Sequence, residues 1–468
     1  MRVLEQLEPK NVLSFFEDLC AIPHGSGNTK AISDYCVKFA ESRGLEVHQD
    51  GLNNVVIVKP ATPGYEAAPT VIVQGHLDMV AEKTPDSPIN FLTDGLELEV
   101  DGDFIRAKGT TLGGDDGIAV AMALAVLDAK DLAHPRLECL FTIDEETGMD
   151  GAVGFDASIL QGKRLLNIDS EEEGILTVSC AGGAHAAVRI PMTANECALD
   201  SAEIRISGLK GGHSGAEIDK GRANATITLG RVLQALVDEL EVRLVSAEGG
   251  LKDNAIPNAA RAVIALEDGK LPRAQEICAE LQDTFRREYA AADPDVTVTF
   301  TPGTVASQAL TLRDTKKVCC FLGLYPNGIE SMSMDIPGLV QTSCNLGIFK
   351  VNGSVLEGSG SVRSSIASRK QLLLRRIGLL AEGLDGTLCV SGEYPAWEYR
   401  RESHLRDVMC KVYKDQYGQD MKVEAIHAGL ECGLFCGKIP GLDAVSFGPN
   451  LYDIHTVKEH MSISSVQR

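Results

Sequence analysis

Seven acidic and imidazole side chains stand where apolar stretches of the sequence end, and their types suit the binding of divalent cations. They are His76 and Asp78 (Gly-His-Leu-Asp), Asp115 (Gly-Gly-Asp-Asp-Gly), Glu145 and Glu146 (Asp-Glu-Glu-Thr-Gly), Asp169 (Asn-Ile-Asp) and His455 (Asp-Ile-His). Two imidazoles and three carboxylates are enough ligands for two cations when one carboxylate bridges them. Two carboxylates remain, which could orient a ligand and accept a proton. The pattern predicts a two-metal hydrolase.

Each motif taken alone has a simpler interpretation. Asp115 follows two glycines and precedes a helical pattern, so by itself it favours a helix N-cap. The three consecutive acids 144–146 are equally consistent with an acidic surface turn, although they would repel one another strongly unless cations intervened. A histidine and an aspartate separated by one residue, as in His76 and Asp78, are common outside metal sites. The combination of motifs, not any one of them, supports a metal site.

The elements that must position these residues alternate between helix and strand over residues 1–185. Amphipathic spacing predicts helices over 10–21 and 29–43, and an alanine-rich helix over 117–129. Short aliphatic stretches predict buried strands at 55–58, 71–74, 137–142 and 165–168. Alternation of this kind predicts an α/β fold, a mixed sheet covered by helices. Ligands gather at the carboxyl ends of strands in such sheets, which is where the candidate residues stand.

The pattern changes over residues 186–392. There a helix–strand–strand–helix–strand order occurs twice, with helices expected at 222–239, 273–289, 312–324 and 368–383. We therefore expect an inserted α+β lid domain made of two similar sub-units. Residues 393–468 return to the first style and carry His455, so a discontinuous catalytic domain of residues 1–185 and 393–468 is predicted. The final residues 465–468 are expected to open a helix that continues beyond the sequence.

Composition and charge limit the classes of partner. The 468 residues are 44% hydrophobic and 24% charged, as in globular proteins, and carry a formal net charge of −22. That charge argues against nucleic acid and against anionic membrane surfaces as partners. The first residues contain no apolar segment typical of a secretory signal, and no apolar stretch reaches eighteen residues. A cytoplasmic enzyme without a membrane span is expected.

Three further motifs extend the set. They are Gly211-Gly212-His213-Ser214-Gly215, Asn254-Ala255-Ile256-Pro257 and His427-Ala428-Gly429-Leu430-Glu431-Cys432-Gly433. Taken in order with the motifs above, they resemble those of the M20 metallopeptidases, and within them the cytosolic aminoacyl-histidine (Xaa-His) dipeptidase branch. The resemblance covers nearly the whole chain.

The resemblance implies a role for each residue. One metal would be held by His76, Asp115 and Asp169, and the other by Asp115, Glu146 and His455. Asp78 would orient His76, Glu145 would be the general base, and His213 would donate a hydrogen bond to the reacting carbonyl oxygen. Asn254 and Arg363 would hold the carboxylate end of the substrate, and Gly429 and Glu431 would line the other side of the pocket.

The same resemblance implies hydrolysis of unblocked dipeptides, including Xaa-His dipeptides, with two divalent ions. Zinc suits the imidazole and carboxylate ligands, and Co²⁺ or Mn²⁺ would also fit. Deacylation of N-acyl amino acids and cleavage of tripeptides remain open alternatives, as does a protein that binds metal and dipeptide without turnover. A homodimer is compatible with the resemblance. Because the expected lid is about twice the usual size, His213 could act within its own chain.

Overall fold

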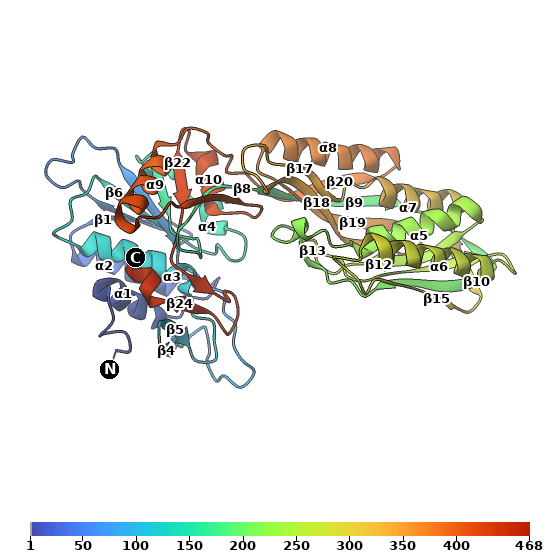
Figure 1. Ribbon diagram of the computed structural model, residues 1–468, viewed down its shortest axis with the longest axis horizontal. Coiled ribbons are helices and arrows are strands. Elements are labelled where there is room, and N and C mark those ends of the chain that lie inside the picture. The colour runs from blue at the N-terminus through green and yellow to red at the C-terminus, as the bar shows by residue number, and fades with distance from the viewer. Residues whose placement is uncertain (1) are drawn as a thin grey trace. The chain divides into compact units, whose positions relative to one another are not determined.

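The computed structural model describes residues 2–468, and its contacts divide the chain into two compact units. The first unit comprises the residues up to Ser179 together with Tyr399–Ala425 and Leu430–Arg468. The second unit comprises Cys180–Glu398 and Ile426–Gly429 (Figure 1). The lid role expected for residues 186–392 stays a prediction.

A mixed sheet forms the centre of the first unit. Its strands are ordered β1-β2-β6-β3-β7-β22-β8-β21, and β6, β3, β7 and β22 are parallel to their neighbours within that group. The bounds are β1 (Glu46–Gln49), β2 (Val55–Lys59), β3 (Val71–His76), β6 (Leu137–Thr142), β7 (Arg164–Asn167), β8 (Ile175–Cys180), β21 (Lys422–Ile426) and β22 (Asp443–Ser446). Successive residues of β2 and β6 are buried, so both faces of the sheet are covered there. The predicted α/β class is confirmed.

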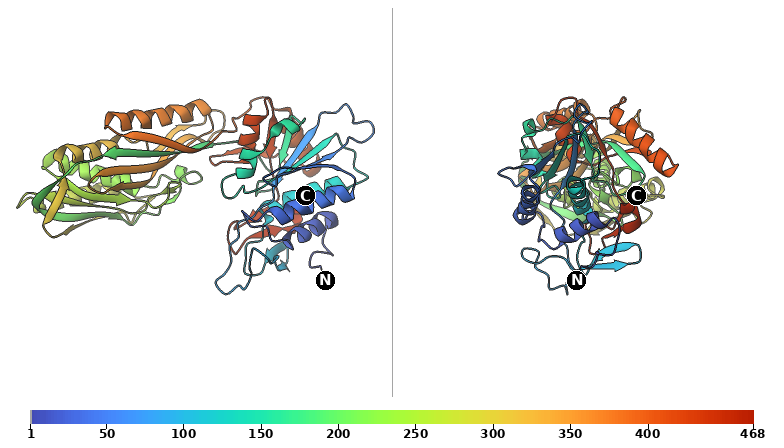
Figure 2. Two further views of the ribbon diagram at one scale, coloured as in Figure 1. Left: turned by 180° about the vertical axis from the view of Figure 1, so that it is seen from behind. Right: turned by 90° about the vertical axis from the view of Figure 1, so that its left-hand side faces the viewer.

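Helices and a small second sheet complete the first unit (Figure 2). The apolar sides of α1, α2 and α3 share one core with Val55 and Ile57 of β2. The helices are α1 (Lys10–Cys20), α2 (Lys30–Ser42), α3 (Gly114–Asp128), α4 (Asp150–Gly154), α9 (His404–Tyr417), α10 (Glu431–Lys438) and α11 (Ile463–Gln467). The small sheet has the order β23-β24-β5-β4, with β4 (Leu98–Asp101), β5 (Phe104–Ala107), β23 (Leu451–Tyr452) and β24 (His460–Ser462).

The second unit is built on one continuous sheet with the path β15-β10-β14-β12-β18-β19-β9-β20. Its strands are β9 (Gly182–Pro191), β10 (Ala194–Ser207), β12 (Arg243–Gly249), β14 (Ala260–Leu266), β15 (Thr297–Pro302), β18 (Val340–Val351), β19 (Val355–Ser364) and β20 (Thr387–Tyr394), with β16 (Ala306–Leu310) and β17 (Gly328–Met332) off the path. Its helices are α5 (Ala225–Glu239), α6 (Leu271–Glu288), α7 (Leu312–Leu324) and α8 (Ala367–Gly383). A separate pair consists of β11 (Gly212–His213) and β13 (Ala255–Ile256).

The two halves of this sheet have the same internal order. In one half, β10 lies between β15 and β14, and β14 pairs with β12; in the other, β9 lies between β20 and β19, and β19 pairs with β18. The helices also correspond, because α5 precedes β12 as α7 precedes β17 and β18, and α6 joins β14 to β15 as α8 joins β19 to β20. The halves meet where β12 pairs antiparallel with β18. The architecture thus contains the repeated helix–strand order that the sequence predicts.

Two local expectations differ from the structure. The last helix begins at Ile463 and not within residues 465–468, because Ser462 is its N-cap and accepts a hydrogen bond from the Ser465 amide at 3.2 Å. Strands β4 and β5 were not predicted, since strands of four residues beside polar turns carry little apolar periodicity.

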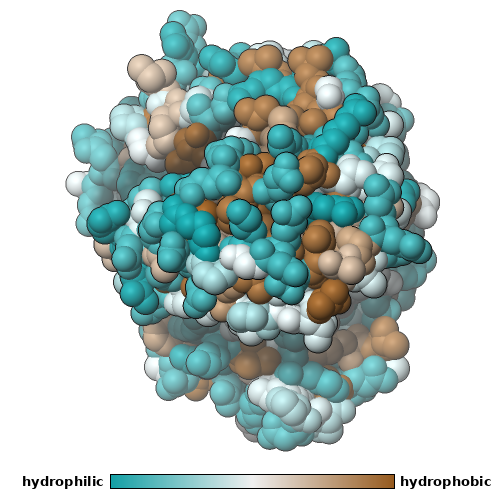
Figure 3. Space-filling model, turned by 90° about the vertical axis from the view of Figure 1, so that its right-hand side faces the viewer, coloured by the Kyte–Doolittle hydropathy of each residue, from teal (hydrophilic) through white to brown (hydrophobic). Residues whose placement is uncertain are grey.

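The surface seen in Figure 3 is mainly hydrophilic, with smaller groups of hydrophobic side chains between the hydrophilic ones. Leu251 and Met334 of the second unit are among the exposed apolar residues, at 94% and 93% exposure. In residues 2–468, no helix combines the length and the apolar composition needed to cross a bilayer.

Candidate active site

The carboxyl ends of three parallel strands carry most of the predicted metal ligands. His76 is the last residue of β3, Glu146 follows β6, and Asp169 follows β7. β3 pairs in parallel with both β6 and β7, so the three segments leave the sheet at one edge. Asp115 lies at the start of α3, and His455 lies in the turn after β23. Asp115 and His455 are 340 residues apart in sequence and meet in this cluster.

Asp115 lies between the two histidines. Its Oδ1 is 3.1 Å from Nε2 of His76, and its Oδ2 is 3.1 Å from Nε2 of His455. Oδ1 of Asp169 lies 3.8 Å from the same His76 nitrogen, and Oε1 of Glu146 lies 3.0 Å from the same His455 nitrogen. One carboxylate therefore presents an oxygen to each of two imidazole–carboxylate pairs. A carboxylate that bridges two cations needs this arrangement.

The interpretation of Asp115 as a helix cap does not hold. The backbone of Asp115 is extended, with φ −84° and ψ 106°, at a kink inside the range of α3, so its torsions alone would permit a cap. Its side chain faces His76 and His455 and is not used to cap the helix. The glycine before Asp115 is explained by packing: a Cβ on Gly114 would lie only 3.0 Å from the Leu451 side chain.

Asp78 connects the histidine of β3 with the acidic segment after β6. Its carboxylate accepts hydrogen bonds from the Ser26 hydroxyl at 2.7 Å and from the Glu145 amide at 3.0 Å. Its Oδ1 is 3.5 Å from Nδ1 of His76, while its own carbonyl oxygen is nearer, at 3.0 Å. An Nδ1–H group bonded to this carbonyl leaves Nε2 of His76 directed at Asp115 and Asp169. The backbone of Asp78 thus shares the orienting task that was predicted for its side chain.

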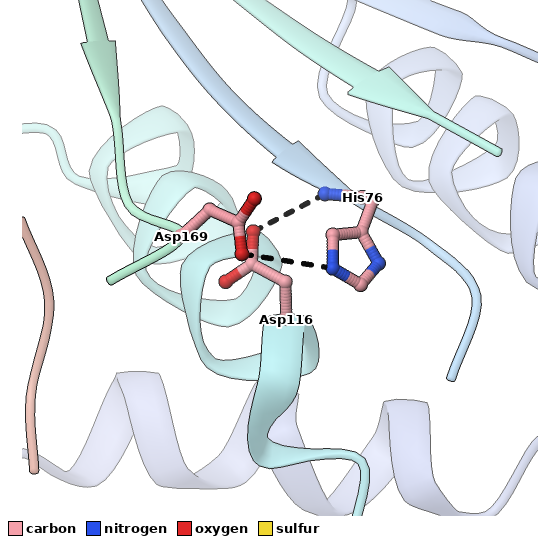
Figure 4. Close-up of side chains that lie close together, drawn as sticks. All are labelled: His76, Asp116 and Asp169. Atoms are coloured by element: carbon pink, nitrogen blue, oxygen red, sulfur yellow. Dashed lines mark hydrogen bonds and ion pairs between the residues drawn. The ribbon is translucent and has the colours of Figure 1, made fainter. Parts of the chain in front are cut away.

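Asp116, which we did not predict as a functional residue, lies in the same cluster (Figure 4). It is buried, and its Oδ2 accepts a hydrogen bond from the His76 amide at 3.2 Å. Ligand atoms of His76, Asp116 and Asp169 lie within 4.8 Å of one another, as do those of His76, Asp115 and Glu146. Both sets could hold a metal ion. Because an oxygen of Asp116 already binds the His76 backbone, Asp116 also fixes the end of β3.

The carboxylates around the histidines favour imidazolium ions. Hydrogen bonds with Asp115 and Glu146 raise the pKa of His455 to about 10. Burial alone would lower the pKa of His76, but hydrogen bonds with Asp115 and Asp78 raise it well above its ordinary value. The pKa of Asp115 is lowered in turn by the two histidines, against the effect of its burial. Positive charge is thus strongly stabilised on both sides of Asp115.

Other carboxyl groups of the cluster lack such compensation. Burial, with repulsion from Asp116 and Asp115, raises the pKa of Asp169 well above its ordinary value. Burial, with repulsion from Glu431 and Glu146, raises the pKa of Glu145 to about 8. The Oδ2 atom of Asp169 is buried and finds no hydrogen-bond partner among residues 2–468. Buried carboxyl groups without a positive partner are suited to bind cations, because the charge of a cation stabilises their ionised form.

The turn that carries His455 is held in an uncommon conformation. Its φ is +61°, in the left-handed region that costs a non-glycine residue roughly 1 kcal/mol or more. Asp453 and Asp144, in segments that also carry candidate ligands, have positive φ values of 50° and 54°. Backbone of this kind concentrates at sites where side-chain direction matters more than local stability.

Glu459 positions Asp115, and sequence reasoning missed it. Its buried carboxylate accepts hydrogen bonds from four consecutive backbone amides, those of Leu112 (2.8 Å), Gly113 (3.2 Å), Gly114 (2.8 Å) and Asp115 (3.5 Å). Because Glu459 follows His455 by four residues, one short segment supplies a candidate ligand and also holds the loop of another. The sequence offers only that spacing as a signal, since nothing in it names the four amides as partners.

Glu431 lies deeper than a pocket-lining residue needs to. It is fully buried, and its carboxylate accepts hydrogen bonds from Gln74 and from the Thr142 hydroxyl at 2.7 Å. Burial raises its pKa to about 7, although these two hydrogen bonds act in the opposite direction. Gln74 lies two residues before His76, so Glu431 braces β3 and β6 beneath the cluster. Its contact with substrate stays a prediction.

The second unit brings its own predicted residues together. His213 on β11 pairs with Ala255 on β13, and the Ser214 amide donates to the Asn254 carbonyl at 2.9 Å. A Cβ on Gly215 would lie 3.0 Å from Cε1 of His213, 3.1 Å from Nε of Arg363 and 2.7 Å from the His427 carbonyl. These groups therefore converge around Gly215, which explains why no larger residue fits there.

The hydrogen bonds of His213 select one tautomer. Its Nδ1 accepts from the amides of Ala216 at 3.0 Å and Gly215 at 3.3 Å, so this nitrogen carries no proton. Burial, followed by the positive charge of Arg363, lowers its pKa. A neutral imidazole with its proton on Nε2 results, which is the form that can donate a hydrogen bond from Nε2.

A mixed α/β sheet with imidazole and carboxylate ligands gathered at its carboxyl edge defines a metal-dependent hydrolase. The sequence model of peptidase family M20/M25/M40 matches residues 72–468. The chain belongs to this family. The resemblance drawn from the motifs is thereby confirmed.

Individual relatives agree along the whole chain. It is 35% identical to the cytosol non-specific dipeptidase of Escherichia coli K12 over 468 residues, covering 100% of this chain and 96% of the relative. The crystal structure of an aminoacylhistidine dipeptidase from Vibrio alginolyticus superposes with a TM-score of 0.94 at 36% identity, covering 99% of this chain and 95% of that one. The aminopeptidase PepT of Bacillus cereus, at 16% identity and a TM-score of 0.54 over 98% and 95% of the two chains, shares the fold.

Proposed function

We propose that the protein hydrolyses the peptide bond of unblocked dipeptides, Xaa-His dipeptides among them, with two divalent cations. The observation that carries the proposal is the position of Asp115, whose two oxygens each lie 3.1 Å from a different histidine. Full-length similarity to proteins named as a non-specific dipeptidase and an aminoacylhistidine dipeptidase supports the substrate class.

The two cations would share Asp115. His76 and Asp169 would complete one site, because an oxygen of Asp169 lies near the His76 Nε2 that also faces Asp115. His455 and Glu146 would complete the other, because an oxygen of Glu146 lies near the His455 Nε2 that also faces Asp115. The cations would supply Lewis-acid polarisation of the peptide carbonyl and of the attacking water. Imidazole and carboxylate donors suit Zn²⁺, and Co²⁺ or Mn²⁺ fit the same set.

Glu145 would move the proton. The backbone amide of Glu145 donates a hydrogen bond to the Asp78 carboxylate at 3.0 Å, so the backbone that carries the Glu145 side chain is fixed. As a carboxylate it would take a proton from the attacking water, and as a carboxylic acid it would pass that proton to the leaving amine. A raised affinity for protons, from burial, suits the second half of this cycle.

His213 would donate its Nε2 proton to the carbonyl oxygen on which charge develops. Comparable donors contribute roughly 3–4 kcal/mol to a transition state. Arg363 and Asn254 would bind the carboxylate end of the dipeptide, and Gly429 and Glu431 would contribute to the pocket. Closure of a lid that carries His213, Asn254 and Arg363 would exclude water from the reaction.

The cytosol is the expected compartment, because the Escherichia coli relative is named as a cytosolic protein. The net charge of −22 argues against nucleic acid as a ligand. Assembly as a homodimer stays a prediction.

Metal content measured beside dipeptide hydrolysis tests the proposal. Purified protein should contain close to two divalent ions per chain and should lose activity on dialysis against a chelator. Activity should return on adding Zn²⁺, Co²⁺ or Mn²⁺. Protein that hydrolyses dipeptides equally well without metal would contradict the proposal.

A substrate panel separates the alternatives. Free dipeptides, N-acetylated dipeptides and tripeptides should be compared by kcat/KM, and free dipeptides should be preferred. Preference for the blocked substrates would identify a deacylase, and preference for tripeptides a tripeptidase. Metal-loaded protein that binds dipeptides without cleaving them would be a binding protein.

A further inference from the structure

Arg363 of the second unit rests on the hydroxyl of Tyr394. Arg363 lies near the end of β19 and is 8% exposed. Its Nη1 donates a hydrogen bond to the Tyr394 hydroxyl at 3.0 Å. Tyr394 is the last residue of β20, and β9 lies between these two strands (Figure 1). The guanidinium and the phenol therefore meet across an intervening strand.

The ring of Tyr394 occupies space that two glycines leave for it. A Cβ on Gly183 would lie 2.5 Å from the hydroxyl and from Cζ of Tyr394, and a Cβ on Gly429 would lie 2.9 Å from Cε2. Tyr394 and Gly183 are also paired residues of β20 and β9. The ammonium of Lys370 donates to the carbonyl of Tyr394 at 2.7 Å and to that of Gly183 at 3.3 Å. The ring of Tyr394 is therefore fixed by packing against the two glycines, and its backbone by the hydrogen bond from Lys370.

The Nε–H of the same guanidinium is not satisfied by the protein. Nε of Arg363 is buried and has no hydrogen-bond partner in the part of the chain that the structure describes. It lies close to Gly215 and His213, because a Cβ on Gly215 would lie 3.1 Å from this Nε and 3.0 Å from Cε1 of His213. A buried cationic N–H without an acceptor is costly, so an anionic ligand at this position would be strongly favoured.

We propose that Tyr394 is a positioning residue that sets selectivity for the free carboxylate of the substrate, by holding the guanidinium of Arg363. The proposal rests on the proposed function, in which Arg363 binds the carboxylate end of a dipeptide. Tyr394 would act through its hydrogen bond to Arg363. With one Nη held by the Tyr394 hydroxyl, the guanidinium presents its other donors in a fixed direction.

The test compares a dipeptide with its C-terminal amide. The metal-loaded enzyme and the Tyr394→Phe variant are assayed on both, and the ratio of the two kcat/KM values is the measurement. Phe keeps the ring between Gly183 and Gly429 but removes the hydroxyl. A hydrogen bond to a charged group is worth roughly a factor of ten or more, so this ratio should fall about tenfold, mainly through a higher KM for the free acid.

Two further variants make the result specific. Tyr325→Phe is the matched control, because Tyr325 is a buried tyrosine of the same unit whose hydroxyl lies 3.9 Å from Cys344 Sγ and over Gly360. It should leave the ratio unchanged. Gly183→Ala places a methyl group against the Tyr394 ring and should lower the ratio as Tyr394→Phe does, by a route that leaves the hydroxyl in place.

The outcomes separate this proposal from the proposed function. If Arg363→Ala abolishes the preference for the free acid but Tyr394→Phe keeps the wild-type ratio, the role of Tyr394 is refuted and dipeptide hydrolysis stands. If Tyr325→Phe lowers the ratio equally, loss of any buried hydroxyl is the cause and the proposal fails. An unmodified enzyme that cleaves no dipeptide, or an Arg363→Ala variant that keeps the preference, would contradict the function on which the proposal rests.

Discussion

Replacing Glu459 by glutamine should weaken metal binding although Glu459 is not expected to touch a metal. The carboxylate is 3% exposed and accepts hydrogen bonds from the amides of residues 112–115, which lead into Asp115. Glutamine keeps the shape but replaces one oxygen by an NH₂ group. Two of the four backbone donors then lose their acceptor.

The magnitude follows from these lost acceptors. Each buried donor left without an acceptor costs about 1–3 kcal/mol, so the native loop loses at least about 2 kcal/mol unless it moves. A loop that moves displaces Asp115, which is expected to serve both cations. Changes in residues that hold a metal ligand in place typically reduce affinity by about 10–100-fold, equivalent to about 1.4–2.8 kcal/mol. The two figures agree.

Titration of the metal-free protein with Zn²⁺, followed by calorimetry, measures the effect. Glu171→Gln is the matched control, because Glu171 is a carboxyl group near the cluster: burial, with repulsion from Asp115 and Glu146, raises its pKa to about 7. At pH 8 this variant removes a negative charge near Asp115 but leaves the four amide bonds of Glu459 intact. Wild-type affinity in Glu459→Gln would refute the reasoning, and equal weakening in both variants would show that charge matters and the hydrogen bonds do not.

Three other predictions concern the same architecture. Glu145→Gln should retain both metals and lose about two to four orders of magnitude in kcat, whereas loss of metal in elemental analysis would mean that Glu145 is a ligand. Asp115→Asn should release both cations together, and a stable variant with one metal per chain would contradict bridging. Acid should destabilise the second unit through His427, because burial and then Arg363 lower its folded-state pKa from 6.5 to about 4. The unfolded chain binds the proton first as pH falls, so this stability is present above about pH 6.5 and lost toward pH 4, with about 2 kcal/mol lost at pH 5. Urea unfolding at pH 7 and pH 5 should show a smaller acid effect in His427→Gln than in the wild type, and equal acid effects would contradict this assignment.

Regular elements and ligand types were predictable because they depend on local patterns. Apolar periodicity located α1, α2, β3 and β6, and the ends of those strands indicated where polar side chains could gather. The family could be predicted from the order of the motifs along the chain, because that order does not depend on distances in the folded structure. Short strands such as β11 and β13 were not predicted, since two residues carry no periodicity.

The detailed roles of neighbouring acids were less accessible. Asp115 and Asp116 are adjacent and chemically identical, yet one faces two imidazoles while the other binds the amide of His76. Only backbone torsion at the start of α3 separates the two directions. The hydrogen bonds that Glu431 accepts from Gln74 and Thr142 were likewise not foreseen, while its predicted contact with substrate stays a prediction.

Residue chemistry and helix or strand periodicity are properties of short segments, so the amino-acid sequence specifies which side chains are available and which local elements carry them. Long-range contacts in the folded chain bring His455 to Asp115 across 340 residues and place Glu459 on the loop before Asp115. Such meetings depend on strand order, in which β22 from the end of the chain lies beside β7. Buried surface and paired backbone groups over the whole sheet select that order, and no single segment contains this information.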